Sequence, residues 1–462
     1  MTAAPAPPPW FWPAVVLIAV GGGALRIAAG FGGLWLDEAW SAQFARDVAT
    51  PAGVFLNIHH DNNHHLNTLW LQLVGYDAPP VVQRGLSIAA GTAAILIAAL
   101  IGGRRGPAAG VVTALLFAVS PILVTYGSEA RGYAPMVLAL LIAIAIADRW
   151  LDRPDTPPPA LAMAVTCLLG LLSQFTMAFG IAAIAGWVAL RGWRERGISG
   201  GADATVRLMG PALILVSVAA TLILVVLPGP GGFQFGHYQA FAVRDLHAGL
   251  SQMLAYSFGP GMSVLLLPIA LGATIAALVA MPSLKPRLAL YALAIVAFPL
   301  AVGLLRIGNA GIARYYLLTS VALLLLAGEV TGGALARRGA VRIGALVMLA
   351  AVLVAGGWRD AALVADRRAD PDRALQVIAA ARPAGATATV ERARAWPVLA
   401  TAAAARRYPL TQSDCGEWLF VDRDGDEPFP ATPVRCDHRY RPVIAGHPTG
   451  LSGTHWRLYR RQ

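Results

Sequence analysis

"FWPAVVLIAVGGGALRIAAGFGGLWLDEAWSAQ", residues 11–43, joins a long apolar run to two adjacent carboxylates that stand between tryptophans. The apolar run near 10–30 matches the roughly 20 residues that a helix needs to cross a bilayer. No basic segment precedes this run, and no convincing cleavage site separates it from Asp37 and Glu38. The stretch therefore predicts a retained first transmembrane helix, not a signal peptide, with both carboxylates just beyond its end.

The whole chain is too apolar for a soluble protein. Of its 462 residues, 57% are hydrophobic and 13% are charged, whereas about 25% of the residues in a soluble domain are charged. The net charge of +11 comes largely from arginines in short gaps between apolar runs, which is typical of membrane topology signals. We therefore expect an integral protein that contacts membrane lipids and has no nucleic-acid partner.

Eleven apolar runs are candidates for spanning helices. They lie near residues 10–30, 81–102, 107–125, 132–148, 159–176, 178–190, 207–228, 257–280, 288–305, 315–335 and 340–357. With a cytoplasmic N-terminus, thirteen basic residues fall in cytoplasmic gaps and five in the opposite gaps, as the positive-inside rule requires. The sequence thus predicts an α-helical polytopic membrane domain over 1–357, with a first outer loop at 31–80 and a further outer loop at 229–250.

The remaining residues, 358–462, are expected to form a small α/β domain on the outer side. Residues 372–410 read as a helix, a short strand and a second helix, and residues 416–424 and 454–461 read as strands. Cys415 and Cys436 both lie in this segment. A disulfide between them suits an oxidising compartment, and two free thiols are the alternative. Cys167 lies in an apolar helix, where we expect a buried, unreactive thiol.

The carboxylate pair is the first candidate for chemistry. Consecutive residues of a helix point about 100° apart, so Asp37 and Glu38 cannot both face one ligand if this segment is helical. We expect one to face a cavity and the other to cap the start of the helix, where a negative charge is favoured. The alternative is that both are solvated residues on an amphipathic interfacial helix.

The segment "HHDNNHHLNTLWLQLVG", residues 59–75, is the densest polar cluster of the chain. His64 and Asn67 stand three residues apart and can share a helix face. Two other readings remain open, a zinc site and a polar loop with a local hydrogen-bond network. The spacing matches no named zinc motif, and the roles of His59, His60 and His65 stay open.

Two short outer turns carry basic and aromatic residues. The turn at 126–136 contains Glu129, Arg131 and Tyr133, and a simple Glu129–Arg131 pair is one interpretation. The turn at 306–318 contains Arg306, Arg314 and Tyr315. Arginines on the outer side run against the positive-inside trend, and their guanidinium groups suit a phosphate or carboxylate ligand.

With these motifs in order, the chain resembles the GT-C superfamily of integral-membrane glycosyltransferases, which includes protein O-mannosyltransferases and the aminoarabinose transferase of lipid A. The resemblance rests on "WLDEAWS", "DNNHHLNTLWLQL", "SEARGYAPMVLALLIA" and "ARYYLLTSVALLLLAG" and covers residues 10–335. It implies a polyprenyl-phosphate-linked sugar donor, used at the outer face of the bacterial cytoplasmic membrane, and a lipid, glycan or protein acceptor. The family usually has a proline where His65 stands, so the local backbone here is expected to differ.

The resemblance also implies roles for the candidate residues. Asp37 would be the general base that deprotonates the acceptor hydroxyl in one inverting displacement, and Glu38 would position the loop or the acceptor. An apolar wall beside Asp37 would raise its basicity. Arg131, Arg306 and Arg314 are candidates to stabilise charge on the leaving phosphate. No second strongly acidic motif appears, so we expect no metal ion and no other cofactor.

Two other functions are alternatives for a membrane protein of this kind. A transporter or flippase for lipid-linked sugars would favour ionisable residues deep in its spanning helices and often inverted repeats, and the sequence shows neither. A non-catalytic protein that binds lipid-linked sugars is the second alternative. The intact acidic motif argues against it.

Overall fold

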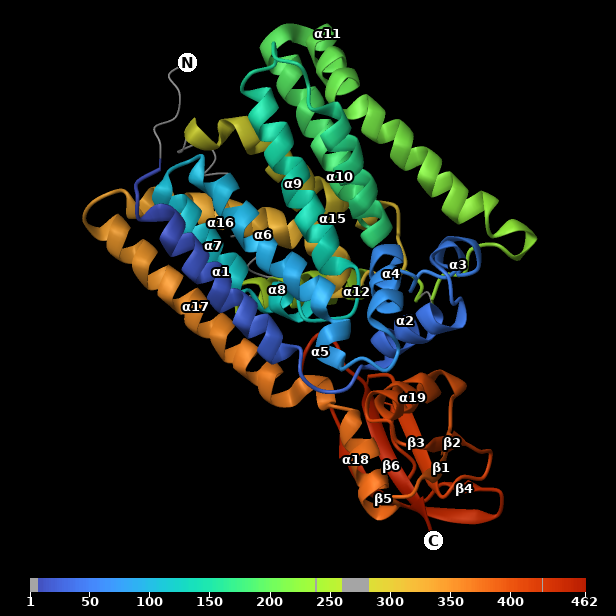
Figure 1. The fold of residues 1–462 in the computed structure, drawn as a ribbon. Helices are drawn as coiled ribbons and strands as arrows, with labels where there is room; N and C mark the ends of the chain where they lie inside the picture. The colour runs from blue at the N-terminus through green and yellow to red at the C-terminus, as the bar shows by residue number, and fades with distance from the viewer. Residues whose placement is uncertain (1–6, 237–238, 260–281, 426) are drawn as a thin grey trace.

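The computed structural model describes residues 7–236, 239–259, 282–425 and 427–462. A large helical body carries a smaller domain that combines helices with a sheet (Figure 1). The N-terminal end of α1 (Phe11–Ala29) and the C-terminal domain lie at opposite ends of this body. This is the predicted fold class, an α-helical body with a C-terminal α/β domain.

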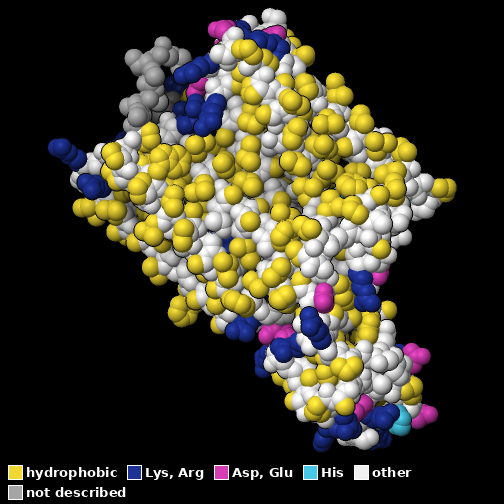
Figure 2. All heavy atoms as spheres, viewed as in Figure 1, with side chains coloured by type: hydrophobic (Ala, Val, Ile, Leu, Met, Phe, Trp, Pro, Cys, Tyr) yellow, Lys and Arg dark blue, Asp and Glu magenta, His cyan; other side chains and the backbone are white. Residues whose placement is uncertain are grey.

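Seven helices in the described residues are long and apolar enough to cross a membrane. They are α1, α6 (Gly85–Gly103), α9 (Tyr133–Leu151), α11 with its π-helical end (Met177–Val226), Lys285–Leu304, Ala313–Leu335 and α17 with the turn that follows (Ala340–Ala369). Apolar side chains cover the helical body, whereas Lys and Arg gather at its two ends (Figure 2). The chain is therefore a multi-pass membrane protein.

The other predicted spans are shorter, interrupted or outside the described residues. The run at 107–125 is divided at Ser120 into α7 (Pro107–Val119) and α8 (Pro121–Tyr126), and α10 (Ala160–Ser173) has 14 residues. The run at 257–280 lies mostly outside the described residues. Eleven spans therefore remain a prediction.

The long element α11 (Met177–Thr221) contains two helices, as the runs at 178–190 and 207–228 suggest. Gly197 has a φ of 77° and a ψ of −178°, which are not helical values. A Cβ added at Gly201 would lie 2.7 Å from the carbonyl oxygen of Ala189. Twelve residues of straight helix would separate these two positions by about 18 Å, so the chain turns back at Gly197.

The expected first outer loop is largely helical. It contains α2 (Leu36–Asp47), α3 (Pro51–Leu56), α4 (His65–Val74) and α5 (Pro80–Gln83). These helices lie between the helical body and the C-terminal domain (Figure 1). The expectation of a loop throughout 229–250 is wrong, because α12 (Val243–Phe258) begins inside it and buries Leu250, Met253 and Leu254.

Ionisable residues do occur inside the spanning segments, contrary to the expectation from the sequence. Arg287 forms ion pairs with Asp148 of α9, at 2.6 Å, and with Glu329 of α16 (Leu317–Leu335). Arg26 of α1 donates to the carbonyl oxygens of Gly22, Phe117 and Ala118. Each lies within about two turns of a helix end, where it joins that end to a neighbouring helix.

The C-terminal domain packs helices and turns against a mixed six-stranded sheet in the order β2-β1-β3-β6-β5-β4. Its elements are α18 (Asp372–Ala381), β1 (Ala386–Val390), α19 (Trp396–Ala405), β2 (Leu410–Gln412), β3 (Trp418–Arg423), β4 (Val434–Arg435), β5 (His438–Gly446) and β6 (His455–Arg461). The predicted helix–strand–helix order and the strands at 416–424 and 454–461 are present. The sequence analysis missed β5, which contains Pro442 and a shift of register next to it.

The C-terminal domain and the first outer loop share one hydrophobic core. Leu34, Ala42 and Leu71 of the loop belong to the same buried cluster as Trp418 and Trp456 of the sheet. Helix α17 (Ala340–Asp366) runs without a break across the expected boundary at 357/358. The division into domains at that position stays a prediction, and the shared core indicates that the two parts pack as a unit.

Cys415 and Cys436 are joined by a disulfide and are 21 residues apart in sequence. Such a loop predicts a stabilisation of about 3 kcal/mol from restriction of the unfolded chain. Replacing both cysteines by serine should therefore lower the thermal unfolding midpoint of the C-terminal domain. Hydrogen exchange of β3 and β5 would report the change locally. A reductant should speed this exchange in the wild type but leave the double variant unaffected. Exchange that is the same in the wild type, the reduced wild type and the double variant would contradict the prediction.

Candidate active site

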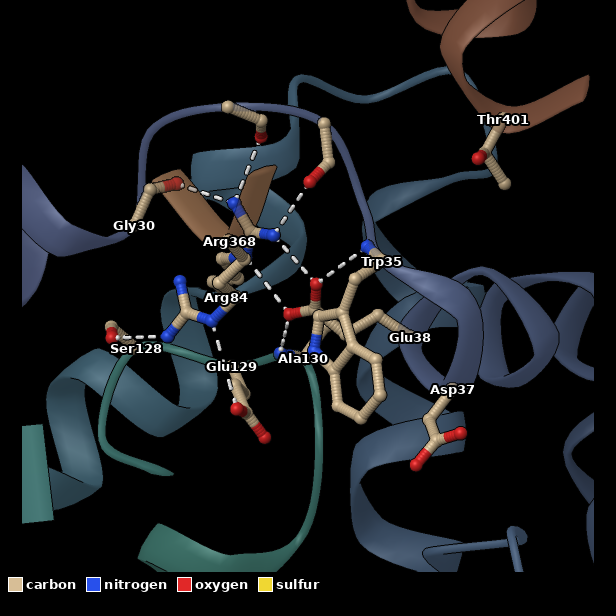
Figure 3. A network of polar contacts seen from close by, with 12 residues as sticks. Gly30, Trp35, Asp37, Glu38, Arg84, Ser128, Glu129, Ala130, Arg368 and Thr401 are labelled. Carbon is tan, nitrogen blue, oxygen red and sulfur yellow. Dashed lines mark hydrogen bonds and ion pairs between the residues drawn. The ribbon is translucent and has the colours of Figure 1, made fainter. Parts of the chain in front are cut away.

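Asp37 and Glu38 leave α2 in different directions. Glu38 is fully buried, and its Oε2 accepts a hydrogen bond of 3.2 Å from the backbone N–H of Trp35, the residue that precedes the helix. Asp37 points away from this network (Figure 3) and keeps 25% of its side chain exposed. The expected divergence is present, and the alternative of two solvated carboxylates is wrong because Glu38 has no contact with solvent.

Glu38 forms a buried ion pair with Arg84. The two side chains are joined by hydrogen bonds of 2.8 and 2.5 Å and are both fully buried. Arg84 also donates to the carbonyl oxygens of Gly30, Gly32 and Gly33, so it binds the chain between α1 and α2. Burial acts to raise the pKa of Glu38, but the charge and hydrogen bonds of Arg84 outweigh it and keep that pKa below its usual value.

The turn that carries Arg131 is held through its backbone by three side chains. Glu38 accepts from the Ala130 N–H at 2.7 Å, Asn67 donates to the Ala130 carbonyl at 2.6 Å, and Ser87 donates to the Arg131 carbonyl at 2.7 Å. These side chains come from α2, α4 and α6. Because each bond is to the backbone, together they set the position from which the Arg131 side chain projects.

Arg131 joins Asp37 to His64. Its guanidinium forms an ion pair with Oδ2 of Asp37 and contacts Nε2 of His64 at 3.1 and 3.2 Å. The guanidinium carbon also lies 5.3 Å from the ring centre of Tyr133 and 5.7 Å from that of Trp35. Aromatic rings at these distances attract a cation, so Arg131 is held on several sides.

His64 is placed to be a neutral acceptor. Its Nδ1 lies 3.1 Å from the carbonyl oxygen of Ser173, so that nitrogen carries the proton. Its Nε2 can then accept from Arg131. Burial and the charge of Arg131 lower the pKa of His64 well below its usual value. His64 therefore orients the guanidinium without adding a second positive charge.

Arg314 is the second arginine beside Asp37. Its Nη1 lies 3.4 Å from Oδ2 of Asp37, and its Nε has no hydrogen-bond partner among the described residues. Burial acts to raise the pKa of Asp37, but the charges of Arg131 and Arg314 outweigh it, and that pKa lies below its usual value. The expectation that an apolar wall makes Asp37 more basic is therefore wrong for this arrangement.

Two of the predicted residues lie apart from Asp37. Glu129 does not pair with Arg131; its carboxylate lies 3.6 Å from Nε of Arg368, and both side chains are fully buried. Arg306 is exposed at the end of α15 (Phe298–Leu304), and it forms no ion pair within the described part of the chain. The remaining candidate, Tyr315, lines a narrow pocket with Met136, Leu140, Thr176, Met177, Gly180 and Leu318.

The polar segment at 59–67 is mostly a hydrogen-bond network, one of the readings left open above. Asn62 donates to the carbonyl oxygen of Asp37 at 2.9 Å, and Asp61 accepts from the backbone of Gly236 at 2.9 Å. His60 lies 3.0 Å from Asp61. No group of three or more His, Cys, Asp or Glu side chains in the described residues is arranged to hold a metal ion, and the absence of a cofactor remains a prediction.

Several residues that build this site were not among those expected from the sequence, chief among them Arg84 and Arg368. For Arg84 a signal was present, since an arginine directly before the apolar run of α6 faces either lipid headgroups or a buried carboxylate. For Ser87 and Trp35 no signal distinguishes them from ordinary residues near a membrane surface.

His65 provides a test of this site because it stands next to His64 in a different environment. It stacks on Phe55 at 5.0 Å between ring centres, and burial lowers its pKa to about 4. Its neutral form therefore stabilises the fold above pH 6.5, the usual histidine pKa. This contribution, roughly 3 kcal/mol at most, is lost as the pH falls toward 4.

His65→Phe should reduce the loss of stability between pH 6.5 and 4 and leave activity near the wild-type value. Thermal unfolding midpoints of the wild type and the variant across this pH range measure the effect. The same pH dependence in both proteins would contradict the prediction.

No protein-family model matches the chain, and no curated protein matches it in sequence. Solved structures do match. The crystal structure of ArnT from Cupriavidus metallidurans in the apo state has a TM-score of 0.53 at 13% identity and covers 96% of this chain and 97% of that chain. The structure of the same protein bound to undecaprenyl phosphate has a TM-score of 0.53 at 14% identity, with 97% of each chain covered.

The apo crystal structure of the oligosaccharyltransferase from Archaeoglobus fulgidus is a more distant match. It has a TM-score of 0.50 at 11% identity and covers 87% of this chain and 64% of that chain. These neighbours are GT-C glycosyltransferases, and ArnT matches over nearly its full length. The resemblance seen in the sequence is thus confirmed at the level of the fold: the chain has the fold of a GT-C glycosyltransferase.

Proposed function

We propose that this protein is a glycosyltransferase that moves a sugar from a polyprenyl-phosphate donor to an acceptor hydroxyl. The observation that carries the proposal is the placement of two arginines, Arg131 and Arg314, on one partly exposed carboxylate, Asp37. The fold adds support because a neighbour with the same architecture, ArnT, was solved with undecaprenyl phosphate bound.

Arg131 and Arg314 are suited to bind the phosphate of the donor. A guanidinium offers several N–H donors in a fixed plane that matches phosphate oxygens. Arg131 is held by His64 and by a turn whose backbone is bonded by three side chains, and Nε of Arg314 has no hydrogen-bond partner in the described part of the chain. Charges fixed in advance stabilise a leaving group without reorganising during the reaction. We assign both arginines to the leaving phosphate, and Arg306 has no role in this step.

Asp37 is the proposed general base. Its carboxylate accepts the proton of the acceptor hydroxyl, the acceptor oxygen forms a bond to the anomeric carbon, and the bond from that carbon to the phosphate oxygen breaks with inversion. The paired arginines lower the basicity of Asp37. A phosphate beside Arg131 and Arg314 supplies an opposing charge, which weakens their hold on the carboxylate and restores its basicity.

Glu38, a candidate catalytic residue in the sequence analysis, is assigned a positioning role. Both of its carboxylate oxygens are bonded to Arg84 and to backbone N–H groups, so it is not free to take a proton from a substrate. It holds the start of α2, which carries Asp37, against the turn that carries Arg131. The acceptor remains a lipid, a glycan or a protein.

We place the reaction at the outer face of the bacterial cytoplasmic membrane. Support comes from the distribution of basic residues. Arg104 and Arg149 lie at the C-terminal ends of α6 and α9, and Arg191 lies shortly before the reversal of α11 at Gly197. These helix ends lie away from α2 and the C-terminal domain (Figure 1). The positive-inside rule assigns that end to the cytoplasm. No metal is expected, because the two arginines meet the charge of the leaving phosphate.

Asp37→Asn should reduce sugar transfer by about 100- to 10,000-fold, the range for loss of a general base. The variant keeps the side-chain shape and should still fold. Turnover of a panel of polyprenyl-phosphate sugars by purified protein in nanodiscs measures the effect and identifies the sugar. Asp47→Asn is the matched control, because Asp47 lies near the end of the same helix and bonds to Gln43 at 2.7 Å.

Full activity of the Asp37→Asn variant would remove Asp37 as the base. The alternatives predict other results in the same assay. A non-catalytic binder would bind a donor without consuming it even in the wild type, and a flippase would move the donor across a vesicle membrane without breaking its phosphate bond.

The proposed mechanism gives a role to two of the three outer arginines and none to the third. Arg131→Gln and Arg314→Gln should each lower kcat/KM for the donor by about 100- to 1,000-fold, which is typical of losing a donor to a developing negative charge. Arg306→Gln should stay near the wild-type value, because Arg306 is exposed and forms no described ion pair. Steady-state kinetics with the donor identified above measures all three. A large loss in Arg306→Gln with normal activity in Arg314→Gln would reverse the assignment.

A further inference from the structure

The junction between α17 and the C-terminal domain has an unusual backbone. Arg367, Arg368, Ala369 and Asp370 have consecutive φ values of 50°, 57°, 64° and 28°. Residues other than glycine rarely adopt this left-handed region, and each costs about 1–2 kcal/mol. Four in succession persist only where the surrounding contacts enforce them.

The Arg368 side chain is fully buried. It extends from the 367–370 segment into the helical body and forms hydrogen bonds there. Its Nη1 donates to the carbonyl oxygen of Ala29 at 2.7 Å, at the end of α1. Its Nη2 donates to the carbonyl oxygen of Thr125 at 2.9 Å and to Oγ of Ser128 at 2.7 Å. One guanidinium therefore joins α1 to the turn that precedes Arg131.

Arg368 also belongs to a buried group of four charges. Its Nε lies 3.6 Å from Glu129, and both side chains are fully buried. Glu129 stands next to Ala130, whose backbone N–H is bonded to Glu38, and Glu38 is paired with Arg84. Two arginines and two carboxylates, of which Glu129 belongs to the turn at 128–131, are thus buried together at this turn (Figure 3), and burial of each charge depends on its partner.

The neighbours of Arg368 tie the same segment to the C-terminal domain. The Ala369 carbonyl accepts from Nε1 of Trp456 at 2.8 Å, and Oδ1 of Asp370 accepts from the backbone N–H of Gly33 at 2.8 Å. The 367–370 segment is therefore clamped between the sheet, the start of the first outer loop and the turn at 128–131. A shift of the segment would move all three.

We infer that Arg368 is a positioning residue for Arg131 and that the C-terminal domain is thereby needed to assemble the phosphate-binding site. Arg368 holds Thr125, Ser128 and Glu129 on one side of the turn, while Glu38, Asn67 and Ser87 hold its other side. The inference rests on the proposed function, in which Arg131 binds the donor phosphate.

A double-mutant cycle tests whether Arg368 acts through Arg131. Arg368→Gln should lower kcat/KM for the donor about 10- to 100-fold, mainly through KM, and should weaken binding of undecaprenyl phosphate by a similar factor. In an Arg131→Gln background the same change should cost less than about 2-fold, because the arginine that it positions is already lost. Losses that multiply independently in the double variant would overturn the inference.

Controls separate positioning from loss of the fold. Arg406→Gln, in the same domain, removes an exposed ion pair with Asp372 and should leave kinetics and phosphate binding unchanged. Arg368→Lys keeps the charge but not the fork of donors, and should recover only part of the loss. If Arg368→Gln does not fold, Glu129→Gln, which keeps the side-chain shape, carries the cycle and should show the same dependence on Arg131.

The outcomes also distinguish this inference from the proposed function. A wild type that binds and consumes the donor, together with an Arg368 variant that behaves independently of Arg131, refutes the inference alone. A wild type that neither binds undecaprenyl phosphate nor consumes any polyprenyl-phosphate sugar refutes the proposed function, and the inference with it.

Discussion

The buried pair of Glu38 and Arg84 is the interaction on which the rest of the site depends. A buried carboxylate that stays ionised needs a partner, and Arg84 meets that need while binding three carbonyl oxygens between α1 and α2. The Glu38 carboxylate also accepts a hydrogen bond from the backbone N–H of Ala130, in the turn that carries Arg131. Its neighbour Asp37, one residue earlier on the same helix, is thereby carried to Arg131. Glu38 thus holds the site together, and Asp37 is the carboxylate that acts in it under the proposed function.

Much of this arrangement was predictable from the sequence. Apolar runs of about 20 residues predict spanning helices because a bilayer excludes unsatisfied backbone groups, and seven such helices are present in the described residues. The divergence of Asp37 and Glu38 follows from helical geometry. The grouping of Asp37, His64, Arg131 and Arg314 follows from placing their loops on one side of the membrane.

What the sequence could not predict is how the charged residues pair. Glu129 and Arg131 are only two residues apart in sequence, yet Glu129 pairs with Arg368, a residue 239 positions further along the chain. The lowered pKa of Asp37 depends on arginines from two separate turns. Pairing of this kind is decided by tertiary distances, and no local pattern encodes it. The same holds for β5, where Pro442 conceals a strand that its sheet neighbours stabilise.

The proposed function requires Arg131 and Arg314 to bind the donor phosphate beside Asp37. A cryo-electron microscopy structure of the protein in nanodiscs with undecaprenyl phosphate would test this binding. We expect phosphate oxygens about 2.7–3.2 Å from both guanidinium groups, with the Asp37 carboxylate alongside and open to an acceptor. A phosphate bound at Arg306 or at the opposite end of the helical body, with Asp37 still paired to both arginines, would contradict it.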